Sequence, residues 1–153
     1  MQDTLKTTLT RQWRRSGKKP KIVVDTNLFV SGLLASGPPS RLIDRLTKRR
    51  LTLCTSGTIF EEYSRVIHRF GRLSKTKRDK LLGKIRQHTL WVHPTQSVVL
   101  VKADPKDNKF LECAIAAHAD FLVSGDSDLI NIISFERIPI VTLSDFNSIM
   151  GWD

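Results

Sequence analysis

The strongest constraint on the fold is a series of short apolar runs that alternate with longer helical segments. Several of these runs are apolar at every position, so a strand built from them has apolar side chains on both faces. Such strands belong to parallel sheets that are covered by helices on both sides. The sequence therefore predicts an α/β protein with a central, mostly parallel sheet. The predicted strands are 21–25, 51–54, 97–101, 120–125 and 138–142.

Helical patterns fill most of the sequence between these strands. Each predicted helix has apolar residues at helical spacing and a cap or turn residue at its start. The first twenty residues, MQDTLKTTLTRQWRRSGKKP, are basic and polar, and we expect them to form a flexible arm before a single domain at 21–153. The predicted helices are 39–50, 55–70, 74–89, 107–119 and 144–150.

Composition restricts the cellular setting. The chain has 153 residues, 40% of them hydrophobic, which suits one domain with a real core. No apolar run approaches the roughly 20 residues of a membrane span, and the basic start lacks the apolar region of a secretory signal. Cys54 and Cys113 lie in apolar surroundings without metal-ligand spacing. We therefore expect buried, reduced thiols in a cytoplasmic protein without membrane contact.

The positive charge is unevenly distributed. The net charge is +10, and residues 41–88 hold fourteen Lys and Arg against four acids. Residues 89–153 reverse this balance, with nine acids against four Lys and Arg. A basic middle of this kind forms either a solvated helical face or a surface for phosphate backbones, to which it is drawn by counterion release.

Three aspartates stand where a parallel sheet places its ligands, beyond the carboxyl ends of the strands. Asp25 ends the first predicted strand in KIVVDTNLFVSG, and Asp126 follows the apolar run FLVS. Asp107 opens a helix after an Asp-Pro turn, and a helix start can face the same edge. These three carboxylates are therefore candidates for one site.

A fourth carboxylate comes from the helix at 55–70, where Glu61 and Glu62 are adjacent. At about 100° per residue, Glu61 lies nearly opposite the apolar stripe of that helix. Glu62 lies on the flank of the stripe, three residues after Ile59 and four before Val66. We therefore choose Glu62 for the site and expect Glu61 to be solvated.

Four converging carboxylates repel one another unless a cation neutralises them. Oxygen-only sites suit hard cations such as Mg²⁺ or Mn²⁺. Each acid also has a purely local interpretation as a helix cap, a turn residue or half of an ion pair on its own helix. Those local interpretations are a cap of a helix starting at Thr26 for Asp25, an N-cap for Asp107, turn and cap positions for Asp126 and Asp128, and a pair with Arg65 or Arg69 for Glu62.

The segments VVDTNLFVSGLL, EEYSRVIHRF and DPKDNKFLECAIAAHADFLVSGDSDLI resemble the PIN-domain nucleases, and most nearly the VapC-like toxins of toxin–antitoxin systems. The resemblance covers about residues 21–150. It implies a three-layer α/β/α fold and a ribonuclease that uses Mg²⁺ or Mn²⁺. It also implies an RNA substrate, a possible antitoxin partner and a homodimer. The residues that match the family's acids are Asp25, Glu62, Asp107 and Asp126, with Asp128 as a weaker additional metal ligand and Asn27 as a neighbouring polar residue.

Two other functions are compatible with parts of the sequence. A PIN-like fold could serve as a non-catalytic RNA-binding or protein-interaction module. A phosphate-accepting α/β domain of the receiver or phosphatase type needs a pair of aspartates near the first strand, and this chain offers only Asp25 there. The nuclease is therefore favoured over both.

Overall fold

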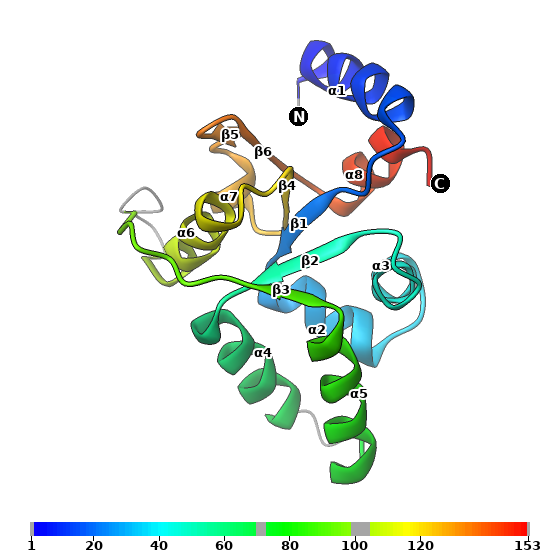
Figure 1. Cartoon of the computed structure of the whole chain (residues 1–153), viewed down its shortest axis with the longest axis vertical. Coiled ribbons are helices and arrows are strands. Elements are labelled where there is room, and N and C mark those ends of the chain that lie inside the picture. The colour runs from blue at the N-terminus through cyan, green and yellow to red at the C-terminus, as the bar shows by residue number, and fades with distance from the viewer. Residues whose placement is uncertain (1, 70–72, 99–104, 153) are drawn as a thin grey trace.

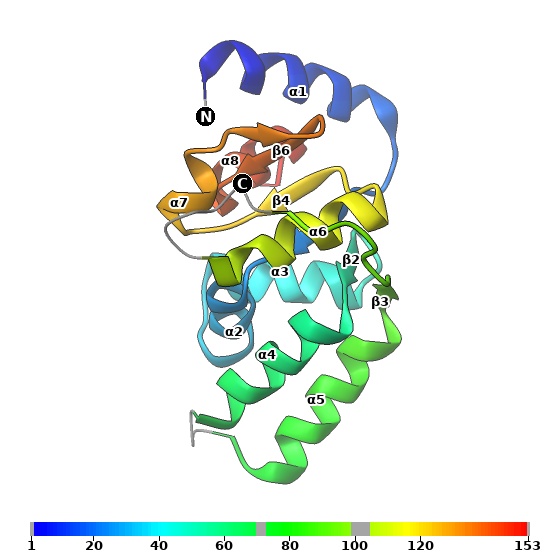
Figure 2. The same cartoon turned by 90° about the vertical axis from the view of Figure 1, so that its left-hand side faces the viewer.

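The structure is a computed structural model that describes residues 2–69, 73–98 and 105–152. Within these residues, a six-stranded sheet has the order β3-β2-β1-β4-β6-β5 and is flanked by helices (Figure 1, Figure 2). Every pairing is parallel except that of β5 with β6. The predicted α/β class with a mostly parallel sheet is thus confirmed. The strands are β1 (Lys21–Val24), β2 (Thr52–Thr55), β3 (Thr89–Trp91), β4 (Phe121–Val123), β5 (Ser134–Phe135) and β6 (Ile138–Val141).

The central strands are buried because their apolar side chains face helices on both sides. All four residues of β6 and all three of β4 are buried, as are the last three residues of β1. Helix α6 contacts β1, β2 and β4, and α2 contacts both α3 and α4. The helices are α1 (Asp3–Ser16), α2 (Thr26–Leu34), α3 (Pro38–Thr47), α4 (Gly57–Arg69), α5 (Lys75–Gln87), α6 (Asn108–Ala117), α7 (Ser127–Ile130) and α8 (Leu143–Met150), and the 3₁₀ turn η1 (Pro105–Asp107) precedes α6.

The N-terminal segment differs from the predicted flexible arm. Residues 3–16 form the helix α1, which packs on α8. Leu9 is buried, and the Trp13 ring lies 5.4 Å from that of Phe121 in β4. Leu5, Leu9 and Trp13 are spaced four residues apart, so they form one apolar stripe on an otherwise basic helix. The basic composition hid this stripe, and its burial against the domain holds the segment in place.

Strand β3 was not predicted: the predicted helix 74–89 includes Thr89, and no predicted element covers Leu90 and Trp91. It extends the sheet beyond β2. The predicted strand at 97–101 lies largely outside the described residues, and Ser97 and Val98, which are described, belong to no strand. The predicted closing helix is α8, whose cap is Thr142 rather than Ser144.

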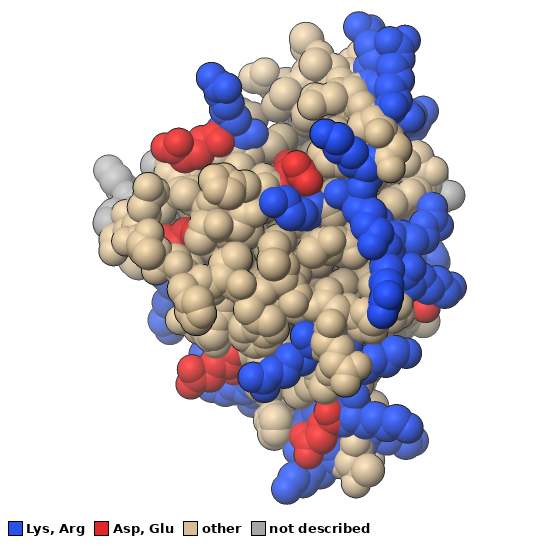
Figure 3. Space-filling model, viewed as in Figure 1, with Lys and Arg blue, Asp and Glu red and all other residues tan. Residues whose placement is uncertain are grey.

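Both cysteines are buried and free, as predicted. Burial raises the pKa of the Cys54 thiol to about 11 and that of Cys113 to about 12. Among the described helices, none is long and apolar enough to cross a bilayer. Lys and Arg side chains gather on the side of the molecule where α1, α3 and α5 lie (Figure 3).

Candidate active site

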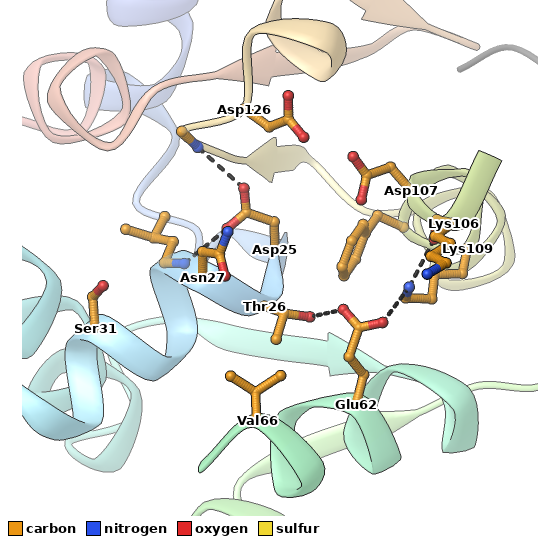
Figure 4. Close-up of a pocket in the computed structure, with 13 residues that line it drawn as sticks. Asp25, Thr26, Asn27, Ser31, Glu62, Val66, Lys106, Asp107, Lys109 and Asp126 are labelled. Carbon is orange, nitrogen blue, oxygen red and sulfur yellow. Dashed lines mark hydrogen bonds and ion pairs between the residues drawn. The ribbon is translucent and has the colours of Figure 1, made fainter. Parts of the chain in front are cut away.

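A pocket of about 500 Å³ opens beyond the carboxyl ends of β1 and β4. All four predicted acids line it: Asp25 after β1, Glu62 from α4, Asp107 before α6 and Asp126 after β4 (Figure 4). The carboxylates of Asp107 and Asp126 point toward the same space, and Glu62 reaches toward it from α4. The remaining lining residues are Thr26, Asn27, Leu28, Ser31, Val66, Lys106, Lys109, Phe110 and Gly125.

Asp25 is only 6% exposed, and its carboxylate accepts hydrogen bonds from several donors. One oxygen accepts the backbone N–H of Leu28 at 2.9 Å, which makes Asp25 the N-cap of α2. The other accepts the backbone N–H of Gly125 at 3.1 Å and the hydroxyl of Ser124. The helix N-terminus adds a favourable dipole. Asp25 is therefore both a cap and a pocket residue, and it is held rigidly between β1 and β4.

Glu62 is held by a lysine from across the pocket. Lys109 Nζ lies 2.5 Å from one Glu62 oxygen and also donates to the Lys106 carbonyl oxygen at 2.7 Å. The other Glu62 oxygen accepts the hydroxyl of Thr26. Arg65 Nη2 lies 3.8 Å from the oxygen that faces Lys109. Glu61 is exposed and Glu62 lines the pocket, as helical geometry predicts.

These contacts set the charge state of Glu62. Burial acts to raise the pKa of Glu62. The hydrogen bonds from Lys109 and Thr26, with the positive charges of Lys109 and Arg65, act in the opposite direction and leave the pKa below its usual value. Glu62 is thus ionised at neutral pH, and the Lys109 ammonium is its counter-charge.

The other two acids differ in their surroundings. Asp126 caps α7 by accepting the backbone N–H of Asp128 at 2.9 Å, and its own backbone N–H donates to Ser124 Oγ at 2.9 Å. Asp128 is exposed and is not among the residues that line the pocket. Asp107 is half-buried at the junction of η1 and α6, and its side chain does not cap that helix. The structure thus gathers four of the five predicted ligands.

The donor chemistry of the pocket fits a hard divalent cation, because its acidic ligands are all carboxylates. The side chains are not arranged around one ion as they lie. In the described part of the chain, no three Asp, Glu, His or Cys side chains stand close enough together to hold a metal. Glu62 in particular faces Lys109, so it would have to leave this lysine to reach a cation.

Three further residues shape the pocket, and the sequence did not single them out. Thr26 and Lys109 hold Glu62, and Ser124 joins Asp25 to Asp126. Ser124 and Thr26 could have been suspected because each lies within two residues of a predicted acid. Lys109 follows Asp107 by two positions, but nothing local indicates that its partner lies 47 positions earlier in the chain.

Comparisons with known proteins agree with this architecture. A PIN domain family model matches residues 21–128, so the chain belongs to the PIN domain family. It is similar to the "Uncharacterized protein MJ1680" of Methanocaldococcus jannaschii, with 28% identity in an alignment of length 124 that covers 74% of this chain and 76% of the relative. The crystal structure of PAE2754 from Pyrobaculum aerophilum aligns with a TM-score of 0.55 and 14% identity over 88% of this chain and 91% of that one.

The family membership gives the pocket a chemical class. PIN domains are generally nucleases, so the chain has a nuclease-type domain. The matched segment begins at Lys21 and ends at Asp128, and it contains all four acids that line the pocket. The structural similarity at 14% identity shows the fold alone.

Proposed function

We propose that this protein is a ribonuclease that hydrolyses RNA phosphodiester bonds with the help of Mg²⁺ or Mn²⁺. The observation that supports this proposal most directly is the meeting of four carboxylates from four separate segments in one pocket. Carboxylates rarely share a pocket without a cation to neutralise them. The PIN domain match supports the same class of chemistry.

In this proposal Asp25, Glu62, Asp107 and Asp126 hold the cation. Asp128 is left out because its side chain does not line the pocket. When bound, the cation would activate a water and stabilise the negative charge that develops on the phosphate. Asp25, fixed by three donors, provides the rigid end of the ligand set.

The two pocket lysines have a different role. Lys106 and Lys109 bring positive charge to the pocket, where they attract the RNA phosphate before cleavage. Glu62 would have to exchange Lys109 for the cation, and Lys109, which also lines the pocket, would then be available to pair with a phosphate. The pocket would thus keep its charge balance while the metal and the substrate enter.

The test is cleavage of a labelled single-stranded RNA by the purified protein with Mg²⁺, Mn²⁺ or EDTA. Asp126→Asn should abolish metal-dependent cleavage, and Asp128→Asn, an adjacent acid outside the pocket, is the matched control that should cleave normally. Asp25→Asn should also be inactive, with a thermal melt to show that it is folded. Metal-dependent cleavage by folded Asp126→Asn or Asp25→Asn at the parental rate would refute the proposed site.

A second candidate is a non-catalytic RNA-binding module with the same fold. It is favoured by the ion pair between Lys109 and Glu62, which leaves that carboxylate neutralised without a metal. Such a module would bind RNA equally well in EDTA and in Mn²⁺, and it would never cleave it. The cleavage assay therefore decides between the two functions.

We propose further that the nuclease acts as the toxin of a toxin–antitoxin pair. The support is the resemblance of its motifs to VapC-like toxins. A cognate antitoxin would bind over the acidic pocket, and the toxin would form a homodimer. Induced expression should then arrest growth, and Asp126→Asn should relieve the arrest. Normal growth with active, soluble protein would contradict the toxin role.

A further inference from the structure

A cluster of six cations lies at the end of the sheet opposite the pocket. The strands β1 and β2 are parallel, with Lys21 paired to Thr52, so the residues that precede them meet at the amino edge of the sheet. Lys and Arg residues dominate both of these preceding segments. We call the cluster the amino-edge patch, and it consists of Arg14, Arg15, Lys18, Lys19, Arg49 and Arg50, all exposed.

Three sets of contacts bring the patch together. The backbone N–H of Thr52 donates to the Pro20 carbonyl oxygen at 2.9 Å, which joins the approaches to β1 and β2. Arg14 Nη2 donates to the Ser148 carbonyl oxygen at 2.9 Å and so fixes the end of α1 on α8. The Arg50 guanidinium lies over the Trp152 ring, 5.3 Å from its centroid. The patch is therefore a defined surface built on packed elements.

Few negative charges offset the patch. Among the described residues, no carboxylate lies within 4 Å of any of the six cations, and the nearby Asp44 and Asp120 have other partners. Asp44 pairs with Lys48, and Asp120 accepts the backbone N–H of Lys21. The C-terminal ends of α1, α3 and α8 each carry a partial negative charge of about −0.5, which makes about −1.5 together. The six positive charges of the patch exceed this negative total, so most of the positive charge is available to a partner.

The surroundings of the patch favour a phosphate backbone as that partner. A membrane-binding surface normally adds apolar side chains that insert among the lipids. The large apolar residues that are clearly exposed in the described chain are Leu90 and Ile133, and neither belongs to the patch. Figure 3 shows that blue side chains spread over the side of the molecule where α1 and α3 lie, which gives a broad cationic surface rather than one small pocket. Broad cationic surfaces suit nucleic acid.

We propose that the amino-edge patch is a second RNA-binding surface, remote from the acidic pocket, that holds the RNA backbone beyond the cleavage site. β1 alone separates the two by about 13 Å, at about 3.3 Å per residue over four residues. A long RNA can reach both surfaces, whereas a dinucleotide in the pocket is too short to do so. The inference rests on the proposed function in its choice of RNA as the polyanion.

The test measures RNA binding in EDTA, so that neither metal nor cleavage enters. The probes are a labelled 30-nucleotide oligouridine and a labelled dinucleotide, and binding is followed by fluorescence anisotropy from 0.05 to 0.5 M salt. The patch variant is Lys18→Glu/Lys19→Glu/Arg49→Glu. The matched control, Lys75→Glu/Lys77→Glu/Lys80→Glu, makes the same change in net charge on exposed positions near the start of α5.

The patch variant should lose about three phosphate contacts. On single-stranded RNA this lowers the slope of log K against log salt by about 2 and weakens binding of the long RNA about 100-fold at 0.1 M salt. The control should lose less than about tenfold, and dinucleotide binding should stay unchanged in both. Equal losses in patch variant and control, or no loss in the patch variant, would overturn the proposal.

Two further outcomes keep the inference separate from the proposed function. Patch-dependent binding without any metal-dependent cleavage would support the patch while refuting the ribonuclease. If the patch variant cleaves long RNA at the parental rate and binds it with unchanged affinity, the proposed role of the patch is refuted and the ribonuclease proposal stands. Polyglutamate serves as a further probe, because it imitates an acidic protein segment. If the patch variant loses polyglutamate binding but keeps RNA binding, the proposal is overturned in favour of an acidic protein segment as the partner.

Discussion

The ion pair between Glu62 and Lys109 gives the sharpest prediction about the pocket. We expect Lys109→Gln to destabilise the fold at pH 7, because Glu62 then remains ionised in the pocket without its closest counter-charge. Exposed ion pairs contribute about 0–1 kcal/mol, and removing one partner of a fully buried pair costs about 3–5 kcal/mol. The Lys109 and Glu62 side chains are 15% and 20% exposed, so the expected cost lies between these limits, at about 2 kcal/mol.

The assay is urea unfolding of parent and variant, with thermal melting as a second measure. A loss of about 2 kcal/mol should lower the melting temperature by about 4–8 °C in a domain of this size. The matched control is Arg65→Gln, which removes the other cation near Glu62. Arg65 is 3.8 Å from Glu62 and 57% exposed, so its loss should cost under about 1 kcal/mol.

The pH dependence separates the ion pair from general packing. The pKa of Glu62 is lowered in the folded state, so the pair stabilises the fold above the unfolded-state pKa of about 4.3 and loses this effect as the pH falls through the folded value. The difference between parent and Lys109→Gln should therefore shrink below about pH 4. A difference that is absent at pH 7, or equally large at pH 3, would refute this account of the pocket.

Other predictions concern the core. Trp13→Ala should cost about 2–3 kcal/mol in urea unfolding, less than a core Trp, since the indole is partly buried against the domain; a loss under about 1 kcal/mol would mean that α1 does not dock in solution. Tyr63→Phe should cost about 1–3 kcal/mol, because the buried hydroxyl donates to the Val24 carbonyl oxygen. The thiols of Cys54 and Cys113, with pKa values of about 11 and 12, should resist a disulfide reagent at pH 8 until denaturant is added; rapid reaction in the folded state would contradict their burial.

The sheet and the choice of acids could be read from the sequence because both depend on local patterns. A run such as IVV before Asp25 predicts a strand buried on both faces, and the end of such a strand predicts a pocket. The angle between residues on a helix was enough to prefer Glu62 over Glu61. Short strands such as β3 and β5 gave too little pattern to be recognised.

Local sequence patterns did not predict which side chains from distant parts of the chain come into contact. The sequence placed Glu62 in a pocket, but only the packing of α4 against α6 brought Lys109 to it. The basic composition of residues 1–20 suggested a free arm, whereas docking on α8 made it a helix.

The sequence by itself determined the α/β class and the four acids, because burial and strand ends are encoded in neighbouring residues. Only the tertiary structure decided where the cations lie. The sequence grouped most of them in a basic middle at 41–88, and the fold brings Arg49 and Arg50 of that segment to the edge of the sheet opposite the pocket. Lys109, from the acidic segment 89–153, reaches the pocket instead. Where these cations lie in space depends on how strands and helices pack, and the order of neighbouring residues along the chain does not specify that packing.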